Sequence, residues 1–440
     1  MSLMLSVSGL RGIAGSELTR DLVASFTQAF VAFNKARTLV LGRDTRPSST
    51  GLQRIIIEAL KPSGCRIINL DITPTPTVLF IVRKIKADAG IMITASHNPI
   101  EYNGLKFINK KGEFLNDPAM EEFIEFIKKP VMAFSTHLAS STVAFSHSVE
   151  KHIDEIMKVI RPAAVRLRVA VDAVAGAGSH AMPMLLESMG CTVHRLNCEY
   201  RSGFPRPPEP IPENITDLCA MVKREKCDIG FAVDPDCDRL SVIDDRGSAI
   251  GEENTLVLAT DFILSRKRGP VVTNLSTTAL MDYVAHRHKC RLYRTRVGEA
   301  NVVEKMKKVR AVIGGEGNGG VIYPRINMTR DALVGSALIL NLIAEKKESL
   351  SKIMNQYPKF CIFKEKIEIT KERFESKISA IIKTFKGKVI KTDGLRITKH
   401  EFWVHVRPSN TEPLVRIIAE ARDKRTAKEI IRTIKRILRK

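Results

Sequence analysis

The chain is poor in aromatic residues, in paired cysteines and in long apolar runs. Aromatic side chains make up 6% of its 440 residues and are not interleaved with the basic segments, which argues against a stacking surface for single-stranded nucleic acid. None of the eight cysteines lies in a CxxC pair or at zinc spacing from histidines, so we expect reduced thiols in the cytoplasm. No stretch reaches the roughly 18 apolar residues of a membrane span, and we expect neither a span nor a signal peptide.

Acidic residues are also scarce, since 48 Asp and Glu stand against 70 Lys and Arg, giving a net charge of +22. Such a charge fits nucleic acid, an anionic surface or phosphorylated substrates. Much of it lies in residues 422–440, where isoleucines recur at helical spacing, so this end is predicted to be an amphipathic helix with a solvated basic face. We therefore expect no nucleic-acid or membrane partner, and a homodimer is left open.

One unit recurs three times along the chain. Each copy has a strand-like run, an apolar-periodic stretch, a second strand that opens at Cys65, Cys191 or Cys290, and a third apolar strand. Ligands gather beyond the carboxyl ends of strands in open α/β sheets. Three such domains would therefore bring to one cleft the polar loops that follow the third strands, at residues 94–99 (TASHNP), 234–239 (DPDCDR) and 315–320 (GEGNGG).

Length and pattern together predict four domains. A new apolar helix starts after residue 251, and a charged segment leads into a last domain whose strand–loop–strand–helix order differs from the repeat. We expect an α/β protein with three related α/β domains, built on mixed sheets, and a smaller C-terminal α+β domain around one central cleft. The expected boundaries are 1–148, 149–250, 251–360 and 361–440.

The first loop presents a hydroxyl group after an apolar strand. Asn98 and Pro99 set a turn that exposes Ser96 on a rigid element, as a covalent carrier requires. His97 beside it is placed to support the serine by hydrogen bonding. Taken alone, the motif is more typical of a plain surface turn with exposed hydroxyl groups.

The second loop carries three alternating carboxylates, Asp234, Asp236 and Asp238. They are hard oxygen ligands of the kind that Mg²⁺ prefers, in combination with a phosphate oxygen. An acidic turn without a cation is disfavoured because the carboxylates repel one another. Arg239 follows and is suited to hold a phosphate beside the metal.

Two further loops combine arginines with hydroxyl groups, as phosphate-binding loops do. Arg43 and Arg46 follow the first strand of the first unit. The last domain gathers a second set in and after the loop 407–413 (RPSNTEP), namely Arg407, Ser409, Asn410, Thr411 and Arg416.

A glycine-rich segment points to a different chemistry. Residues 176–181 (GAGSHA) follow a strand, open a helix and fit the G-x-G-x-x-A pattern of dinucleotide-binding folds, with Glu199 about 20 residues further on. A nicotinamide-dependent oxidoreductase is therefore a remote alternative. The equivalent turns of the other two units lack these glycines, and the motif leaves the three polar loops unexplained.

The loops 94–99, 234–239, 315–320 and 407–413 resemble, in this order, the phosphoserine, metal, sugar-binding and phosphate-binding loops of the α-D-phosphohexomutases. The resemblance covers essentially the whole chain and implies three related α/β domains with a fourth, smaller one. It implies that Ser96 carries a phosphoryl group at a Mg²⁺ site. The roles it suggests for the other residues are metal binding by Asp234, Asp236 and Asp238, sugar contact by Glu316, active-site cations at Arg11 and Lys106 with Lys106 a proton shuttle, and binding of the second phosphate by Arg407, Ser409, Asn410 and Thr411.

Three of these loops depart from the family's pattern, at four positions. Cys237 and Asn410 each stand where glycine is usual, and Asn tolerates positive φ better than most residues. In the sugar-binding loop, Asn318 replaces a serine and Gly320 replaces a histidine. Any proton handling by that histidine must be absent or come from elsewhere.

The resemblance implies a phosphohexomutase that moves a phosphoryl group between O6 and O1 through a phosphoserine, with a hexose 1,6-bisphosphate as intermediate and primer. Residues 295–299 (TRVGE) and 314–320 look most like the branch that acts on glucosamine phosphate, so glucosamine 6-phosphate is the expected substrate. Asn318 offers a donor and an acceptor for a substituent at C2. A phosphomannomutase/phosphoglucomutase is the alternative. A binding protein without the chemistry is disfavoured because Ser96 and the three aspartates remain.

Overall fold

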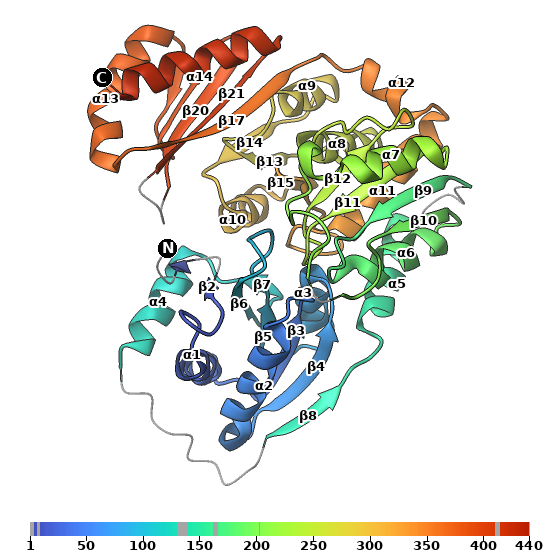
Figure 1. Ribbon diagram of the computed structural model, residues 1–440, viewed down its shortest axis with the longest axis vertical. Coiled ribbons are helices and arrows are strands. Elements are labelled where there is room, and N and C mark those ends of the chain that lie inside the picture. Colours follow the sequence, from blue (N-terminus) through green and yellow to red (C-terminus); the bar gives the residue numbers. More distant parts are fainter. Residues whose placement is uncertain are drawn as a thin grey trace.

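The computed structural model describes residues 4–6, 9–129, 140–161, 166–201, 203–409 and 414–439, which build four sheets flanked by helices (Figure 1). The first sheet has the strand order β1-β2-β6-β5-β3-β4-β8, with β7 paired to β6. Its strands are β1 (Met4–Ser6), β2 (Gly9–Ile13), β3 (Thr38–Arg43), β4 (Arg66–Ile72), β5 (Ala89–Ile93), β6 (Tyr102–Asn109), β7 (Glu113–Phe114) and β8 (Ser141–Ala144). Its helices are α1 (Arg20–Phe33), α2 (Ser49–Leu60), α3 (Thr75–Lys84) and α4 (Asp117–Ile127).

The second and third sheets repeat the centre of the first. The orders β10-β9-β11-β12 and β14-β13-β15-β16 match β4-β3-β5-β6, with three parallel strands and an antiparallel fourth. The predicted threefold repeat and the mixed sheets are therefore confirmed. The strands are β9 (Arg168–Asp172), β10 (Thr192–Leu196), β11 (Ile229–Val233), β12 (Leu240–Ile243), β13 (Val271–Asn274), β14 (Leu292–Thr295), β15 (Ile313–Glu316) and β16 (Gly320–Ile322).

One continuous apolar core joins the second and third sheets. Helix α11 (Ala332–Lys346) is buried at every position from Ala332 to Ile343, as expected for a helix that is apolar on all sides. It packs against α8 on one side and against α5 and α6 on another, so these two units form one body. The helices of this body are α5 (Ser148–Ile160), α6 (Gly178–Ser188), α7 (Thr216–Arg224), α8 (Glu253–Arg266), α9 (Leu280–Arg287), α10 (Glu299–Val309), α11 and α12 (Leu350–Asn355).

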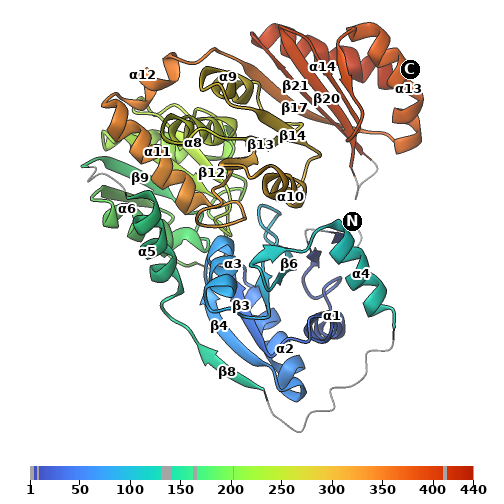
Figure 2. The ribbon, with the colours of Figure 1, turned by 180° about the vertical axis from the view of Figure 1, so that it is seen from behind.

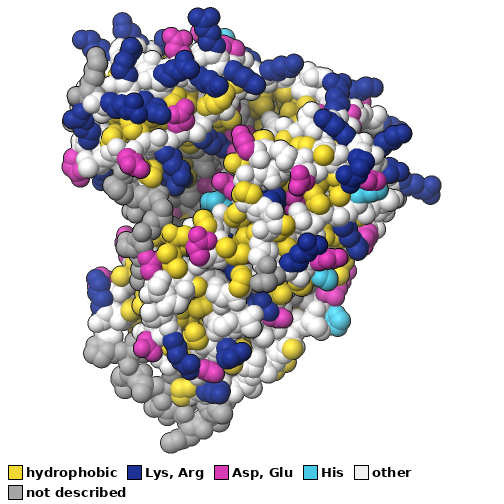
Figure 3. Space-filling model, in the orientation of Figure 1, with side chains coloured by type: hydrophobic (Ala, Val, Ile, Leu, Met, Phe, Trp, Pro, Cys, Tyr) yellow, Lys and Arg dark blue, Asp and Glu magenta, His cyan; other side chains and the backbone are white. Residues whose placement is uncertain are grey.

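The last domain is a five-stranded antiparallel sheet with its own core, as the α+β prediction requires. Helix α14 (Lys424–Arg439) buries its isoleucine face against this sheet, so the predicted amphipathic helix is confirmed, and Lys and Arg side chains gather over the domain (Figure 3). Figures 1 and 2 show it beside the third unit, at the end of the molecule opposite β8 of the first unit. Its elements are β17 (Cys361–Glu368), α13 (Lys371–Phe385), β18 (Lys388–Ile390), β19 (Leu395–Thr398), β20 (Phe402–Pro408), β21 (Leu414–Ala421) and α14.

Polar contacts join this domain to the third unit. Ser276 Oγ lies 2.8 Å from His405 Nδ1, and the Ala279 backbone N–H donates to Glu420 Oε2 at 2.7 Å.

Among the helices of the described residues, none is long and apolar enough to cross a membrane.

Candidate active site

The loop after β5 places Ser96 against the metal loop of the second unit. Ser96 is 3% exposed, and its Oγ donates to Asp234 Oδ2 at 3.0 Å. Its φ of +52° lies in the left-handed region, which is costly for a residue with a Cβ and persists only where the surroundings enforce it. The Ser96 N–H is held by Thr94 Oγ1 at 2.9 Å. The serine hydroxyl is therefore fixed by its loop and aimed across a domain boundary.

Arg46 is the residue that shapes this loop. We expected it to bind phosphate, and the structure contradicts that expectation, because all five of its N–H groups are used within the protein. The side chain is fully buried and pairs with Asp44 at 3.0 Å. The sequence shows the arginine but not the direction of its donors. The remaining four donate to backbone carbonyls of the loop, at Ser96, Asn98, Pro99 and Tyr102.

Replacing Arg46 by methionine is expected to lower the free energy of unfolding by about 3–5 kcal/mol, because the change leaves Asp44 buried without its ion-pair partner. Urea denaturation measures the loss. Arg43→Met is the matched control, since Arg43 pairs with Asp71, whose side chain is 60% exposed, and such pairs contribute below about 1 kcal/mol. Equal losses in the two variants would contradict the assigned role of Arg46.

Three buried carboxylates form the centre of the site. Asp234, Asp236 and Asp238 are each 0% exposed, and each offers an oxygen within 4.8 Å of the others. Burial, followed by the charges of the other two, raises the pKa of Asp234 well above its ordinary value. Among the described residues, Asp236 Oδ1 and Asp238 Oδ1 have no hydrogen-bond partner. Hard oxygen donors without partners, in a cluster that repels itself, fit a divalent cation.

The backbone of the metal loop explains the glycine-rich segment. Cys237 has a φ of +58°, so it adopts the left-handed conformation for which glycine is usual. A Cβ on Gly176 would lie 2.6 Å from the Pro235 carbonyl oxygen, and one on Gly178 would lie 3.0 Å from Cys237 Sγ. These glycines therefore allow the β9–α6 turn to pack against the metal loop. Their role in packing removes the basis for the dinucleotide interpretation.

Cations and a neutral histidine surround the carboxylates. Lys106 Nζ on β6 lies 2.6 Å from Asp236 Oδ2 and 3.5 Å from Asp238 Oδ2. Burial opposes the charge on Lys106, but the two carboxylates outweigh it and raise its pKa. Burial, followed by Arg239 and Arg11, holds the pKa of His97 well below its ordinary value. Lys106 is therefore charged and His97 neutral, with Nδ1 of His97 3.5 Å from Ser96 Oγ.

The two arginines predicted near the transferred group, Arg11 and Arg239, both have partners within the protein. Arg11 on β2 donates to Asn98 Oδ1 at 2.9 Å, and its burial lowers its pKa to about 10. Arg239 donates to Glu209 Oε1 at 2.9 Å, and its Nε, which is buried, has no hydrogen-bond partner among the described residues. Arg11 therefore supports the phosphoserine loop, and Arg239 ties the metal loop to the segment that carries Glu209.

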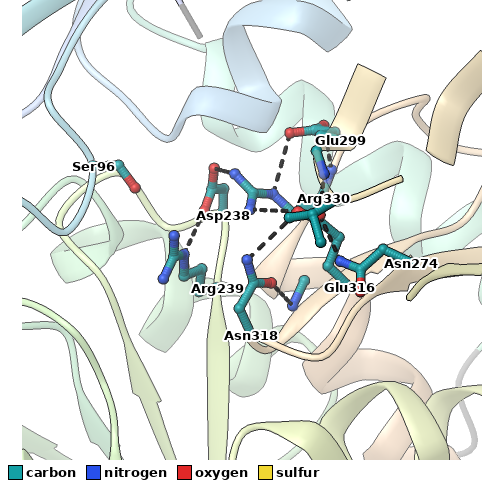
Figure 4. Close-up of polar contacts among 12 residues, drawn as sticks. Ser96, Asp238, Arg239, Asn274, Glu299, Glu316, Asn318 and Arg330 are labelled. Atoms are coloured by element: carbon teal, nitrogen blue, oxygen red, sulfur yellow. Dashed lines mark hydrogen bonds and ion pairs between the residues drawn. The ribbon is translucent and has the colours of Figure 1, made fainter. Parts of the chain in front are cut away.

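The sugar-binding loop begins at the end of β15. Glu316 is 4% exposed and accepts from Asn274 Nδ2 at 2.8 Å and from the Gly298 N–H at 3.1 Å. Although burial disfavours its charge, Arg330 and these donors lower its pKa, so Glu316 is a carboxylate. Asn318 Nδ2 lies 3.5 Å from Glu316 Oε2, and Asn318 Oδ1 accepts from the Gly320 N–H at 3.2 Å (Figure 4).

Arg330 links the metal loop to the sugar-binding loop, and we did not predict it. Nη2 donates to Asp238 Oδ2 at 2.6 Å and Nη1 to Glu316 Oε2 at 3.1 Å (Figure 4). Nε lies 3.1 Å from Glu299 Oε2. The one signal in the sequence was glycine at position 320, where the family pattern has a histidine. It indicated free space at this position but not that Arg330 occupies it.

The predicted phosphate-binding residues are only partly described. Asn410 and Thr411 lie outside the described residues. Arg407 on β20 stands directly opposite Arg416 on β21, and Arg407 Nη1 lies 3.3 Å from Asp393 Oδ2. The Ser409 N–H donates to the Leu414 carbonyl at 2.8 Å. The opposed arginines place two positive charges beside the loop 407–413.

Comparisons with known proteins agree with this geometry. Four family descriptions match in order, namely Phosphoglucomutase/phosphomannomutase alpha/beta/alpha domain I over residues 3–132, domain II over 147–247, domain III over 251–360 and the C-terminal domain over 365–437. A "Phosphoglucomutase/phosphomannomutase" of Thermococcus kodakarensis is 33% identical over 98% of this chain and 97% of its own. A "Probable phosphoglucosamine mutase" of Methanopyrus kandleri is 32% identical over 98% and 96%.

A solved structure shows the same fold. The crystal structure of a phosphoglucomutase/phosphomannomutase family protein from Burkholderia thailandensis superposes with a TM-score of 0.86 at 24% identity, covering 99% of this chain and 98% of the other. The chain therefore belongs to the phosphoglucomutase/phosphomannomutase family. The predicted class of enzyme, a phosphohexomutase and hence an isomerase, is confirmed.

Proposed function

We propose that this protein interconverts glucosamine 6-phosphate and glucosamine 1-phosphate through phosphorylated Ser96 and an enzyme-bound hexose 1,6-bisphosphate. The observation that carries the proposal is the contact of Ser96 Oγ with Asp234, at the edge of a carboxylate cluster that Arg330 joins to Glu316. A phosphoryl acceptor, a metal centre and a sugar-binding carboxylate thus adjoin one another. A hexose phosphate, not nucleic acid or a membrane, is the proposed partner, and the site leaves a homodimer open.

The proposed metal ligands are Asp234, Asp236 and Asp238, with an oxygen on Ser96 as a further ligand. A bound Mg²⁺ would supply positive charge to the transferring phosphoryl group. Lys106 contacts the carboxylates of Asp236 and Asp238, Arg11 contacts Asn98 in the phosphoserine loop, and Arg239 lies on the metal loop. Fixed positive charge of this kind stabilises the charge that develops in phosphoryl transfer without reorganisation at the moment of reaction.

Proton handling falls to Lys106, and His97 supports the serine. Lys106 is charged at rest, so we propose that it gives a proton to the Ser96 oxygen as the bond from that oxygen to phosphorus breaks. The neutral amine then takes the proton that the attacking sugar hydroxyl loses, which restores the charge on Lys106. His97 is neutral and is proposed to orient Ser96 Oγ through Nδ1. This arrangement does not need the histidine that Gly320 replaces.

One set of sites must serve the sugar in two orientations. The phosphate that is not being transferred is proposed to bind Arg407, Ser409, Asn410, Thr411 and Arg416, while Glu316 and Asn318 hold the sugar. After the first transfer the bisphosphate turns over, and its other phosphate returns to Ser96. A hexose 1,6-bisphosphate then primes a dephosphorylated enzyme.

Two further expectations stand as proposals. The domain division 1–148, 149–250, 251–360 and 361–440 assigns the phosphoserine, metal, sugar and phosphate loops to one domain each. A cytoplasmic location is proposed because all eight cysteines are free thiols, as in a reducing compartment.

For the substrate, kcat/KM is expected to be at least about tenfold higher for glucosamine 6-phosphate than for glucose 6-phosphate or mannose 6-phosphate. Ionised Glu316 accepts strongly from a charged amine, and such a hydrogen bond contributes more than one to a neutral hydroxyl. The measurement compares the three sugars on enzyme primed with glucose 1,6-bisphosphate. A preference for the glucose or mannose phosphate would favour the phosphomannomutase/phosphoglucomutase alternative and leave the reaction class standing.

A further inference from the structure

The space above the sugar-binding loop is filled by Arg330. A Cβ on Gly320 would lie 2.2 Å from Arg330 Cδ and 2.7 Å from Arg330 Cγ, so the guanidinium stem passes over the bare backbone of residue 320. This is the position where the family pattern places a histidine. A side chain at position 320 would therefore clash with Arg330 in its observed position.

The backbone fixes where Arg330 begins. Its N–H donates to Glu299 Oε1 at 3.0 Å. Asp331, the next residue, donates its N–H to the Val321 carbonyl at 2.9 Å and caps α11 by accepting from the Val334 N–H at 3.2 Å. The start of a buried helix therefore holds the arginine in place.

The guanidinium group lies at the junction of two loops. Nη2 contacts Asp238 on the metal loop, and Nη1 contacts Glu316 on the sugar-binding loop. Among the described residues, no acceptor takes the second N–H of either nitrogen. Arg330 is only 9% exposed, and an unused donor so deeply buried is unfavourable unless a ligand satisfies it.

We infer that Arg330 is a further substrate-binding residue, which donates the second N–H of Nη1 and the second N–H of Nη2 to an oxygen of the bound sugar phosphate, from the position that the bare backbone of Gly320 allows it to take. The inference rests on the proposed function, because it assigns this site to a hexose phosphate. Arg330 then supplies a permanent positive charge near the position where the family pattern has a titratable histidine, since arginine stays protonated at all ordinary pH values. Binding by Arg330 depends on glycine at position 320.

A double-mutant cycle tests the pair, because two changes that act through one contact are not additive. We would measure the Kd of glucosamine 6-phosphate with Mg²⁺ by calorimetry, in a Ser96→Ala background that binds without turnover. Arg330→Ala is expected to weaken binding at least tenfold. Gly320→Ala is expected to do the same when Arg330 is present, and to change Kd less than twofold when Arg330 is absent. The exposed Arg325→Ala is the control and should leave Kd unchanged.

Equal effects of Gly320→Ala in the two backgrounds, or an unchanged Kd in Arg330→Ala, would overturn the inference. If Arg330→Ala does not fold, as judged by thermal unfolding, Arg330→Lys takes its place, because lysine keeps the charge but has no fork to span both carboxylates. The same cycle with glucose 6-phosphate and mannose 6-phosphate separates this inference from the choice of substrate. If the wild-type enzyme is active but the effects of the two substitutions on Kd are additive, only the role of Arg330 is refuted. If the wild-type enzyme turns over no hexose phosphate, the proposed function is refuted.

Discussion

Ser96→Ala is expected to lower kcat by more than about 10³-fold, as the loss of a covalent nucleophile does. The hydroxyl is the one phosphoryl acceptor that the phosphoserine loop aims at the carboxylate cluster, through its contact with Asp234. The assay follows conversion of glucosamine 6-phosphate by enzyme primed with glucose 1,6-bisphosphate.

The variant should remain folded. The loop is held by Arg46 and Thr94 through the backbone of residue 96, and alanine keeps those bonds. Ser63→Ala is the matched control, since Ser63 lies in the same domain and its hydroxyl donates to the Leu60 carbonyl. Full activity in Ser96→Ala, or an equal loss in Ser63→Ala, would contradict the covalent mechanism.

Asp236→Asn is expected to weaken Mg²⁺ binding at least tenfold and to reduce turnover to the level seen in excess chelator. The substitution keeps the shape of the side chain but removes a charge from the cluster, and amide oxygens are weaker ligands than carboxylates. It also removes the charged partner of Lys106, 2.6 Å away. Calorimetric titration with Mg²⁺ measures the affinity, and restoration of the chelated wild-type enzyme by added Mg²⁺ tests the metal requirement.

Asp217→Asn serves as the control for this change, because Asp217 is exposed in the first turn of α7 in the same domain. It should bind Mg²⁺ and turn over as the wild-type protein does. Undiminished rates of the wild-type protein in excess chelator would show that the carboxylate cluster holds no catalytic metal.

The architecture was largely predictable because strand signals are local. Apolar runs such as 89–93 and 229–233 are fully buried β-strands, and the polar loops after them follow from chain order. The different topology of the last domain was also evident, because the strand–loop–strand–helix order predicted there differs from the repeat. Periodicity and turn residues carry this information without reference to distant parts of the chain.

The contacts of long polar side chains could not be predicted in the same way. Arg46 supports the phosphoserine loop, whereas Arg330 spans two loops from different units. The four backbone carbonyls that Arg46 holds lie 50–56 residues away from it, and Asp238 lies 92 residues from Arg330, so spacing does not reveal these contacts. Gly176 and Gly178 were ambiguous for a related reason, because a bare backbone permits close approach by a pyrophosphate or by another loop equally well.

The phosphorylation state of Ser96 tests the central claim most directly. Purified protein incubated with glucose 1,6-bisphosphate and Mg²⁺, digested and analysed by mass spectrometry, is expected to carry one phosphoryl group on the peptide that contains Ser96. Addition of excess glucosamine 6-phosphate should remove that group and yield the bisphosphate of glucosamine. A phosphoryl group on another residue, or none that the sugar phosphate can discharge, would contradict the account.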